Sequence, residues 1–254
     1  MVVDYGQAMS ATARRVLTAL VMALPFVAVA VAPATATASS YAPLNRPGPA
    51  LDVPAALLAK SLQCSANLRT SHHEPILLVP GTTVTPAVEY SWTYERAFNH
   101  LHLPWCAVTL PDSAMGDIQR AGEYVVHAIR TMHAKTQKKV QIVGHSQGGM
   151  VPRWALRFWP DTRAMVDDLI GMAPSNHGTV DAFGLCLPVS GCAPAIWQQE
   201  LNSPFLAALN SGAETFAGIS YTQIYTVEDE VVVPNFSDAG SSSLRTGAGW
   251  IANI

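Results

Sequence analysis

One serine of this sequence stands in a setting that favours nucleophilic chemistry. It is the centre of Gly144-His145-Ser146-Gln147-Gly148, which follows an apolar run and precedes a helical pattern. A serine nucleophile at the top of a sheet needs a sharp strand-to-helix turn, and the glycines keep side chains out of that turn. The free N–H groups of the helix would stabilise an oxyanion formed there. The pattern predicts acyl transfer at Ser146, with a purely structural turn as the alternative.

A second candidate part of this chemistry lies upstream, in Pro80-Gly81-Thr82-Thr83 at the end of another apolar run. Hydrolases with such a serine turn form an oxyanion hole from one backbone N–H of this loop and one from the residue after the nucleophile, here Gln147. Glycine lets the backbone approach, and the Thr82 hydroxyl offers a further donor. The alternative is a plain strand-ending turn.

The elements that must position these residues alternate along the chain. Short apolar runs predict buried strands at residues 74–81, 105–111, 138–145, 166–174 and 221–230. Helical patterns lie at residues 54–63, 91–102, 115–136, 148–160 and 194–210. Strands that alternate with helices predict an α/β fold, with a mostly parallel central sheet and helices on both faces. No domain boundary is visible, so residues 39–254 are expected to form a single domain.

The N-terminus is typical of an export signal. Arg14 and Arg15 precede an apolar stretch at residues 16–32, and small residues in an A-x-A arrangement follow it. A membrane anchor is the alternative, but the stretch is short and contains Pro25. We expect a signal peptide at residues 1–38 and a secreted mature chain.

The four cysteines agree with an oxidising compartment. Cys186 and Cys192 bracket a Pro/Gly loop that a local disulfide closes easily, which leaves Cys64 to pair with Cys106. A zinc site is the competing interpretation, but the sequence has no C-x-x-C pair and no paired histidine spacing to support it. No metal and no cofactor are expected.

The composition limits the classes of partner. The chain has 254 residues, 49% hydrophobic and 13% charged, with a formal net charge of −3. Such a chain can bury a sizeable core. It has no basic stripe of the kind that releases counterions from phosphates, so nucleic acid is not an expected partner.

Several stretches together carry a family resemblance: "EPILLVPGTT", "LPWCAVTLP", "GHSQGGMVPRWALRFWP", "MAPSNHGTV", "PAIWQQELNSPFLAALN" and "YTQIYTVEDEVVVPN". In order and spacing the chain resembles the family of Candida antarctica lipase B and its secreted bacterial relatives. The resemblance implies the α/β-hydrolase fold and a secreted serine lipase or carboxylesterase that acts on lipid or small ester substrates. We also expect a monomer that contacts a lipid interface transiently.

The resemblance also implies roles for particular residues. Ser146 matches the nucleophile, Thr82 and Gln147 match the oxyanion-hole residues, and Cys64 and Cys106 match the family's N-terminal disulfide. The family has tryptophan where this chain has His145, so the alcohol side of the pocket is not expected to be the same.

Asp229 is the candidate acid of a catalytic triad. It follows the fifth predicted strand, where an α/β hydrolase places the carboxylate that orients the catalytic histidine. Position alone leaves Glu228 and Glu230 as alternatives, and the family register implies Asp229.

The expected order of such a triad is serine, acid, histidine, yet none of the eight histidines follows Asp229. His177 is interpreted as a residue of the pocket rim, with a stand-in base as the alternative. We therefore expect residues 1–254 to be an incomplete, nearly inactive form of the enzyme, with the histidine encoded beyond Ile254. A non-catalytic binding protein and an acyltransferase that uses the same site remain alternatives.

Overall fold

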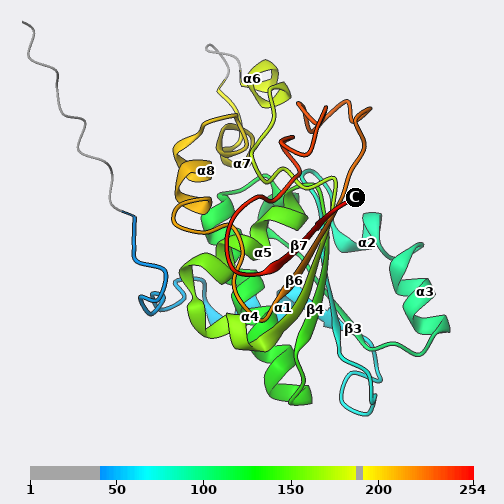
Figure 1. Cartoon of the computed structure of the whole chain (residues 1–254). Coiled ribbons are helices and arrows are strands. Elements are labelled where there is room, and N and C mark those ends of the chain that lie inside the picture. Colours follow the sequence, from blue (N-terminus) through cyan, green and yellow to red (C-terminus); the bar gives the residue numbers. More distant parts are fainter. Residues whose placement is uncertain (1–40, 187–190) are drawn as a thin grey trace, which may run out of the picture. The chain divides into compact units, whose positions relative to one another are not determined.

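The computed structural model describes residues 41–186 and 191–254, so the predicted signal peptide at residues 1–38 lies outside the described residues. A seven-stranded sheet runs in the order β1-β3-β2-β4-β5-β6-β7 (Figure 1). Its strands are β1 (Leu62–Cys64), β2 (Ile76–Val79), β3 (Trp105–Val108), β4 (Val140–His145), β5 (Val166–Met172), β6 (Ser220–Ile224) and β7 (Trp250–Asn253). Only β1 is antiparallel to its neighbour, so the predicted mostly parallel sheet is confirmed.

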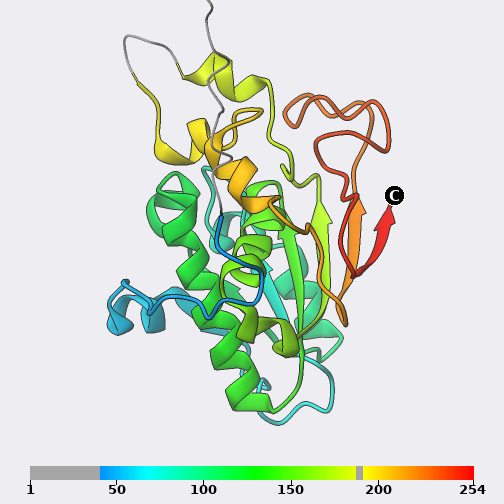
Figure 2. The same cartoon turned by 60° about the vertical axis from the view of Figure 1, so that its left-hand side comes forward.

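Helices cover both faces of this sheet, as predicted. The long α4 and α5 pack on one face, and α2 and α3 lie against the other (Figure 2). The helices are α1 (Ala55–Ser61), α2 (Pro86–Glu89), α3 (Tyr94–His100), α4 (Ile118–Thr136), α5 (Gln147–Phe158), α6 (Asp181–Leu185), α7 (Pro194–Gln198) and α8 (Pro204–Leu209). Two 3₁₀ turns, Pro111–Ala114 and Pro160–Met165, complete the helical elements of the described residues.

The side chains of strand β2 pack into two hydrophobic cores, one on each face of the sheet. Successive side chains of a strand point to opposite faces, so a strand buried on both sides has no polar positions. Leu77 and Val79 belong to the large core beneath α4 and α5. Ile76 and Leu78 belong to a smaller core with Tyr94 and other residues on the α3 side. Burial of all four side chains holds the end of β2, and with it the following loop, in a fixed place.

The helix predicted at residues 194–210 is wrong as a single element, because the structure divides it into α7 and α8. α7 ends at Gln198, and Asn202, with a positive φ of 63°, lies in the turn that separates it from α8. The Ser203 side chain then caps α8 by accepting a hydrogen bond from the Leu206 N–H, with Pro204 at the first helical position. The Ser203-Pro204 capping signal therefore outweighs the apolar periodicity that runs through residues 194–210.

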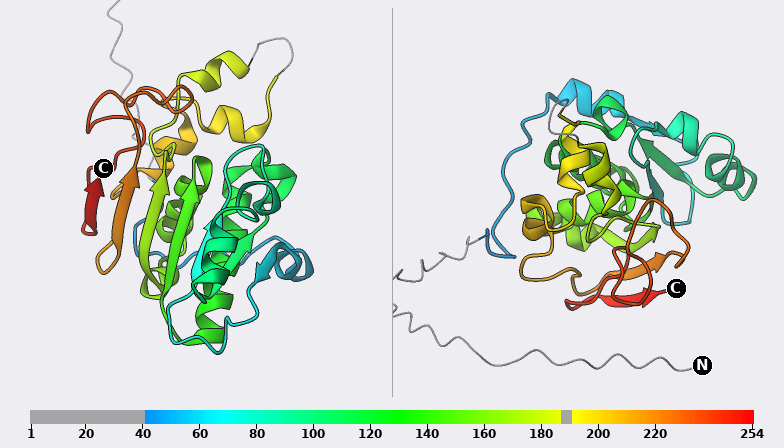
Figure 3. Two further views of the ribbon diagram at one scale, coloured as in Figure 1. Left: turned by 90° about the vertical axis from the view of Figure 1, so that its right-hand side faces the viewer. Right: turned by 90° about the horizontal axis from the view of Figure 1, so that it is seen from above.

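Two edge strands were not predicted, and one predicted strand is shorter than expected. β1 has only three residues. β7 is as long as β2 but is only partly buried and lacks the unbroken apolar run of that strand. The strand predicted at residues 221–230 ends at Ile224, and the chain turns before it reaches Asp229. Figure 3 shows β7 beside β6 at the far edge of the sheet.

Both predicted disulfides are confirmed. Cys64 and Cys106 face each other across the antiparallel β1–β3 pair, so this bond ties the edge strand to the sheet. Cys186 and Cys192 close the segment between α6 and α7. Across the part of the chain that the structure describes, no helix has the length and apolar character needed to cross a membrane.

Candidate active site

Ser146 occupies a strained turn between β4 and α5. Its backbone has φ 53° and ψ −125°, a combination that side chains rarely tolerate. The flanking glycines explain how the turn fits. A Cβ on Gly144 would lie 2.0 Å from the Gly148 carbonyl oxygen, and one on Gly148 would lie 2.1 Å from that of Val79. The predicted strand–serine–helix arrangement is therefore present, and only glycine can occupy either flank without moving the backbone.

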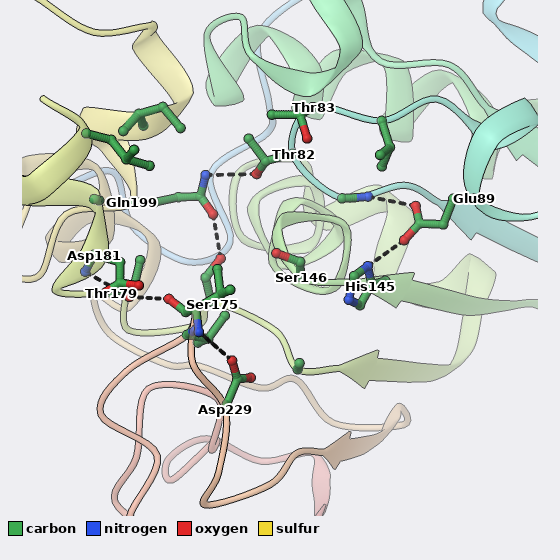
Figure 4. A pocket seen from close by; sticks show the side chains of 18 residues that line it. Thr82, Thr83, Glu89, His145, Ser146, Ser175, Thr179, Asp181, Gln199 and Asp229 are labelled. Atoms are coloured by element: carbon green, nitrogen blue, oxygen red, sulfur yellow. Dashed lines mark hydrogen bonds and ion pairs between the residues drawn. The ribbon is translucent and has the colours of Figure 1, made fainter.

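A pocket of about 420 Å³ lies beside this turn and brings the predicted residues together. Ser146, Thr82 and Asp229 all line it (Figure 4). The Gln147 side chain is buried instead and donates a hydrogen bond to the Ala114 carbonyl oxygen at 2.9 Å. Gln147 is the first residue of α5, however, and an N–H at that position has no acceptor within its own helix.

The Thr82 hydroxyl is oriented by Gln199, a pocket residue that is distant in the sequence. Gln199 donates from Nε2 to Thr82 Oγ1 at 3.2 Å and to the Ala195 carbonyl oxygen at 2.9 Å. Its Oε1 accepts from Ser175 Oγ at 2.8 Å, which fixes the orientation of the amide. Because Thr82 Oγ1 accepts a hydrogen bond here, its own O–H remains free to donate into the pocket.

Replacing Gln199 by methionine is expected to lower the free energy of unfolding by about 1 to 3 kcal/mol, because buried polar groups lose their partners without a large change in volume. Urea unfolding followed by circular dichroism measures the change. Gln119→Met is the matched control, since the Gln119 side chain is exposed. Equal stability of the two variants would contradict the proposed importance of the Gln199 hydrogen bonds.

Asp229 differs from its two acidic neighbours. Its Oδ1 accepts hydrogen bonds from the N–H groups of Val231 and Val232, each at 2.9 Å. Asp229 is half-buried at the pocket, whereas Glu228 and Glu230 are exposed. The turn therefore directs one of the three candidate carboxylates toward the pocket of Ser146, and it is the carboxylate that the family register implied.

The interpretation of His177 as a rim residue is wrong, because His177 does not line the pocket. Its Nε2 lies 2.9 Å from Glu214 Oε1, and its Nδ1 lies 3.3 Å from the Ser241 carbonyl oxygen. Burial alone would raise the pKa of Glu214, but the hydrogen bond from His177 and the charge of buried Arg153 outweigh it and hold that pKa at about 2. With both ring nitrogens engaged, His177 is part of a structural network.

Unlike His177, His145 lines the pocket, and it is paired with a carboxylate. His145 Nδ1 lies 2.5 Å from Glu89 Oε1, and Glu89 Oε2 accepts the Gly81 N–H at 3.0 Å. Glu89 thus joins α2, the loop after β2 and the serine turn. The hydrogen bond to Glu89 raises the pKa of His145 above its ordinary value, against the opposing effect of burial, and the charges of Glu89 and Asp229 add to the increase.

This pair should make part of the stability depend on pH. A histidine whose pKa is raised by folding adds stability below its unfolded pKa of about 6.5, and that contribution disappears as pH rises through the folded pKa. Glu89→Gln is therefore expected to destabilise the protein more at pH 5.5 than at pH 8.5, as measured by urea unfolding. Glu228→Gln, at an exposed site, controls for loss of a charge. An equal effect at both pH values would contradict the expectation.

Sequence reasoning missed several polar residues of the pocket, among them Glu89 and Gln199. Gln199 lies within the quoted stretch "PAIWQQELNSPFLAALN", but nothing in the sequence indicates its contact with Thr82. Glu89 carries no motif, and it is 56 positions from the histidine it contacts. Within the described residues, no group of three or more histidine, cysteine, aspartate or glutamate side chains could hold a metal ion.

Comparisons with known proteins show which family the chain resembles. The sequence profile of the lipase (class 2) family matches residues 73–251. Lipase B of Pseudozyma antarctica is 34% identical over 193 residues, which are 75% of this chain and 56% of that protein. The chain thus spans little more than half the length of this relative.

Solved structures give a similar result. The structure of Aspergillus fumigatus lipase B matches with a TM-score of 0.75 and 29% identity, over 82% of this chain and 51% of that one. The mature form of the Bacillus licheniformis lipase BlEst2 matches with a TM-score of 0.52 and 17% identity, over 64% of this chain and 70% of that one, which is a likeness of fold alone. From its profile match and its fold, the chain belongs to the class 2 lipase family and has the α/β-hydrolase fold.

Proposed function

We propose that this chain carries the nucleophile of a secreted serine ester hydrolase of the lipase or carboxylesterase type. The observation that carries the proposal is the strained backbone of Ser146, held between two glycines and open to a pocket shared with Thr82 and Asp229. The family membership supports lipolytic ester hydrolysis. The two disulfides support secretion, because such bonds persist in oxidising compartments.

In the proposed reaction, Ser146 Oγ attacks the carbonyl carbon of an acyl ester while a base takes its proton. The backbone N–H of Gln147 and donors of Thr82 stabilise the negative oxygen of the tetrahedral intermediate. Collapse of the intermediate expels the alcohol and leaves the acyl group on Ser146, and water then releases the acid. The same residues would serve acyl transfer to another acceptor.

The proposed base is a histidine oriented by Asp229. No histidine of this sequence follows Asp229, and no histidine hydrogen-bonds to its carboxylate within the described residues. This chain supplies the nucleophile, the acid and the oxyanion donors of the proposed machinery. The substrates and activity of the whole protein are part of the proposal.

Chemical rescue by imidazole tests these roles. We expect the 254-residue chain to hydrolyse p-nitrophenyl butyrate slowly, and we expect added imidazole to accelerate the reaction by acting as the base between Asp229 and Ser146. Ser146→Ala corrects for hydrolysis by imidazole itself and should show no protein-dependent rate. Asp229→Asn should reduce the rescue.

Labelling gives a second measurement. A fluorophosphonate should modify Ser146 in the presence of imidazole, as mapped by peptide mass spectrometry. A label on another residue, or turnover that survives Ser146→Ala, would overturn the assignment of the nucleophile. Absence of both labelling and rescue would favour the non-catalytic binding protein.

Transient contact with a lipid interface is a further part of the proposal. Leu185 and Val231 line the pocket and are each 64% exposed. Phe183 on α6 and Trp197 on α7 add exposed apolar surface on the two helices that contribute to the pocket wall. Apolar side chains on elements that form a pocket suit brief docking of a monomer on a lipid surface.

A further inference from the structure

The pocket has two unlike halves, separated by the nucleophile. Figure 4 places Ser146 between Gln199 and Asp181 on one side and His145 and Glu89 on the other. The first side also carries Ala182, Leu185 and Ile196, from α6 and α7. An ester attacked at its carbonyl carbon extends to both sides of Ser146. Its hydrocarbon acyl half fits against Ala182, Leu185 and Ile196, which places its alcohol half against the Glu89–His145 pair.

The hydrogen bonds of this pair fix which ring nitrogen of His145 is left free. An ionised carboxylate only accepts hydrogen bonds, and both Glu89 oxygens already do so, from His145 and from the Gly81 N–H. Nδ1 of His145 therefore carries the hydrogen. Nε2 lies on the opposite edge of the ring and has no hydrogen-bond partner among residues 41–186 and 191–254. The His145 side chain is 48% exposed, so this nitrogen is accessible to a ligand.

The free nitrogen can bind a ligand in either protonation state of the ring. Two carboxylates, Glu89 on α2 and Asp229 in the loop after β6, raise the pKa of the His145 ring. When the ring is neutral, Nε2 accepts a hydrogen bond, and when the ring is protonated, Nε2 donates one. A hydroxyl group both donates and accepts, so it matches Nε2 in both states. An alkyl group can neither donate nor accept a hydrogen bond, and its binding would displace water from Nε2 without replacing the hydrogen bond that the water makes.

We propose that the Glu89–His145 pair is a specificity determinant, whose free Nε2 hydrogen-bonds a hydroxyl on the alcohol half of the substrate. The pocket then selects esters of alcohols that keep a free hydroxyl over esters of simple alkyl alcohols. This inference rests on the proposed function, because it takes an ester as the occupant of the pocket. Glu89 acts as a positioning residue, since it sets the ring orientation and the tautomer.

Two inert amides that mimic such esters test the proposal without any reaction. N-(2,3-dihydroxypropyl)hexanamide carries hydroxyls on its alcohol-side half, and N-propylhexanamide lacks them. Isothermal titration calorimetry on the full chain should give about five- to tenfold tighter binding of the diol, the value of roughly one additional hydrogen bond.

The variants separate recognition by His145 from a merely structural role. His145→Phe should reduce the affinity ratio to about one or below, while His145→Gln, which keeps a polar group at similar reach, should retain part of the preference. His73→Phe is the matched control at an exposed histidine outside the pocket and should leave the ratio unchanged.

The outcomes distinguish this inference from the proposed hydrolase. Equal binding of the two amides, binding of neither, or a ratio that survives His145→Phe would overturn the role of His145, while labelling of Ser146 could still stand. A diol preference that depends on His145, together with no reaction at Ser146, would support the binding role and remove the hydrolase.

Discussion

Gly148→Ala is expected to lower the free energy of unfolding by about 3 kcal/mol or more. The added Cβ would lie 2.1 Å from the Val79 carbonyl oxygen and 2.6 Å from that of Pro80. Both are backbone atoms at the end of β2, which is buried on both faces, so neither can swing aside as a flexible side chain would. To relieve the overlap, α5 and the serine turn must move away from the sheet.

Urea unfolding measures the loss of stability, and Gly184→Ala is the control. Gly184 lies in α6 with nothing within 4 Å of a built Cβ, and alanine favours helix, so this variant should be as stable as the parent or slightly more so. A Gly148→Ala protein of parental stability would show that α5 does not start against β2 as described.

Removal of the Cys64–Cys106 disulfide is expected to have the other large effect. The cross-link joins residues 42 positions apart, and the chain-entropy relation gives about 4 kcal/mol for a loop of this length. The Cys186–Cys192 bond spans 6 positions, for which the same relation gives about 2 kcal/mol. The double alanine variant of the first pair should therefore unfold at clearly lower urea concentration than that of the second.

Both double variants keep the same number of cysteines, so the comparison isolates loop length and position. Cys64 and Cys106 also face each other across β1 and β3, and loss of their bond leaves the three-residue β1 to hold its place by backbone pairing alone. Losses of equal size in the two variants would contradict the entropic reasoning.

The serine turn could be predicted from sequence because its requirements are local. The apolar strand, the two glycines and the helix after Ser146 all lie within about twenty residues, and local backbone geometry links them. The buried strands at residues 74–81 and 138–145 were equally visible, since parallel strands covered on both faces read as unbroken apolar runs.

The rest of the site depends on contacts between distant parts of the chain. Glu89 meets His145 only because α2 folds over the end of β4, and Gln199 meets Thr82 across 117 positions. His177 illustrates the reverse case, because the buried partners that remove it from the pocket, Glu214 and Ser241, cannot be identified from the sequence around it. Spacing along the chain predicts neither kind of contact.

At Ser146 the stability of the backbone conflicts with the proposed role of the side chain as a nucleophile. Its φ of 53° and ψ of −125° lie where glycine rests easily and serine is strained by about 1 to 3 kcal/mol. Glycine at this position would give a more stable protein that lacks the proposed nucleophile. On the proposed role of Ser146, the strain in its backbone is stability given up for reactivity.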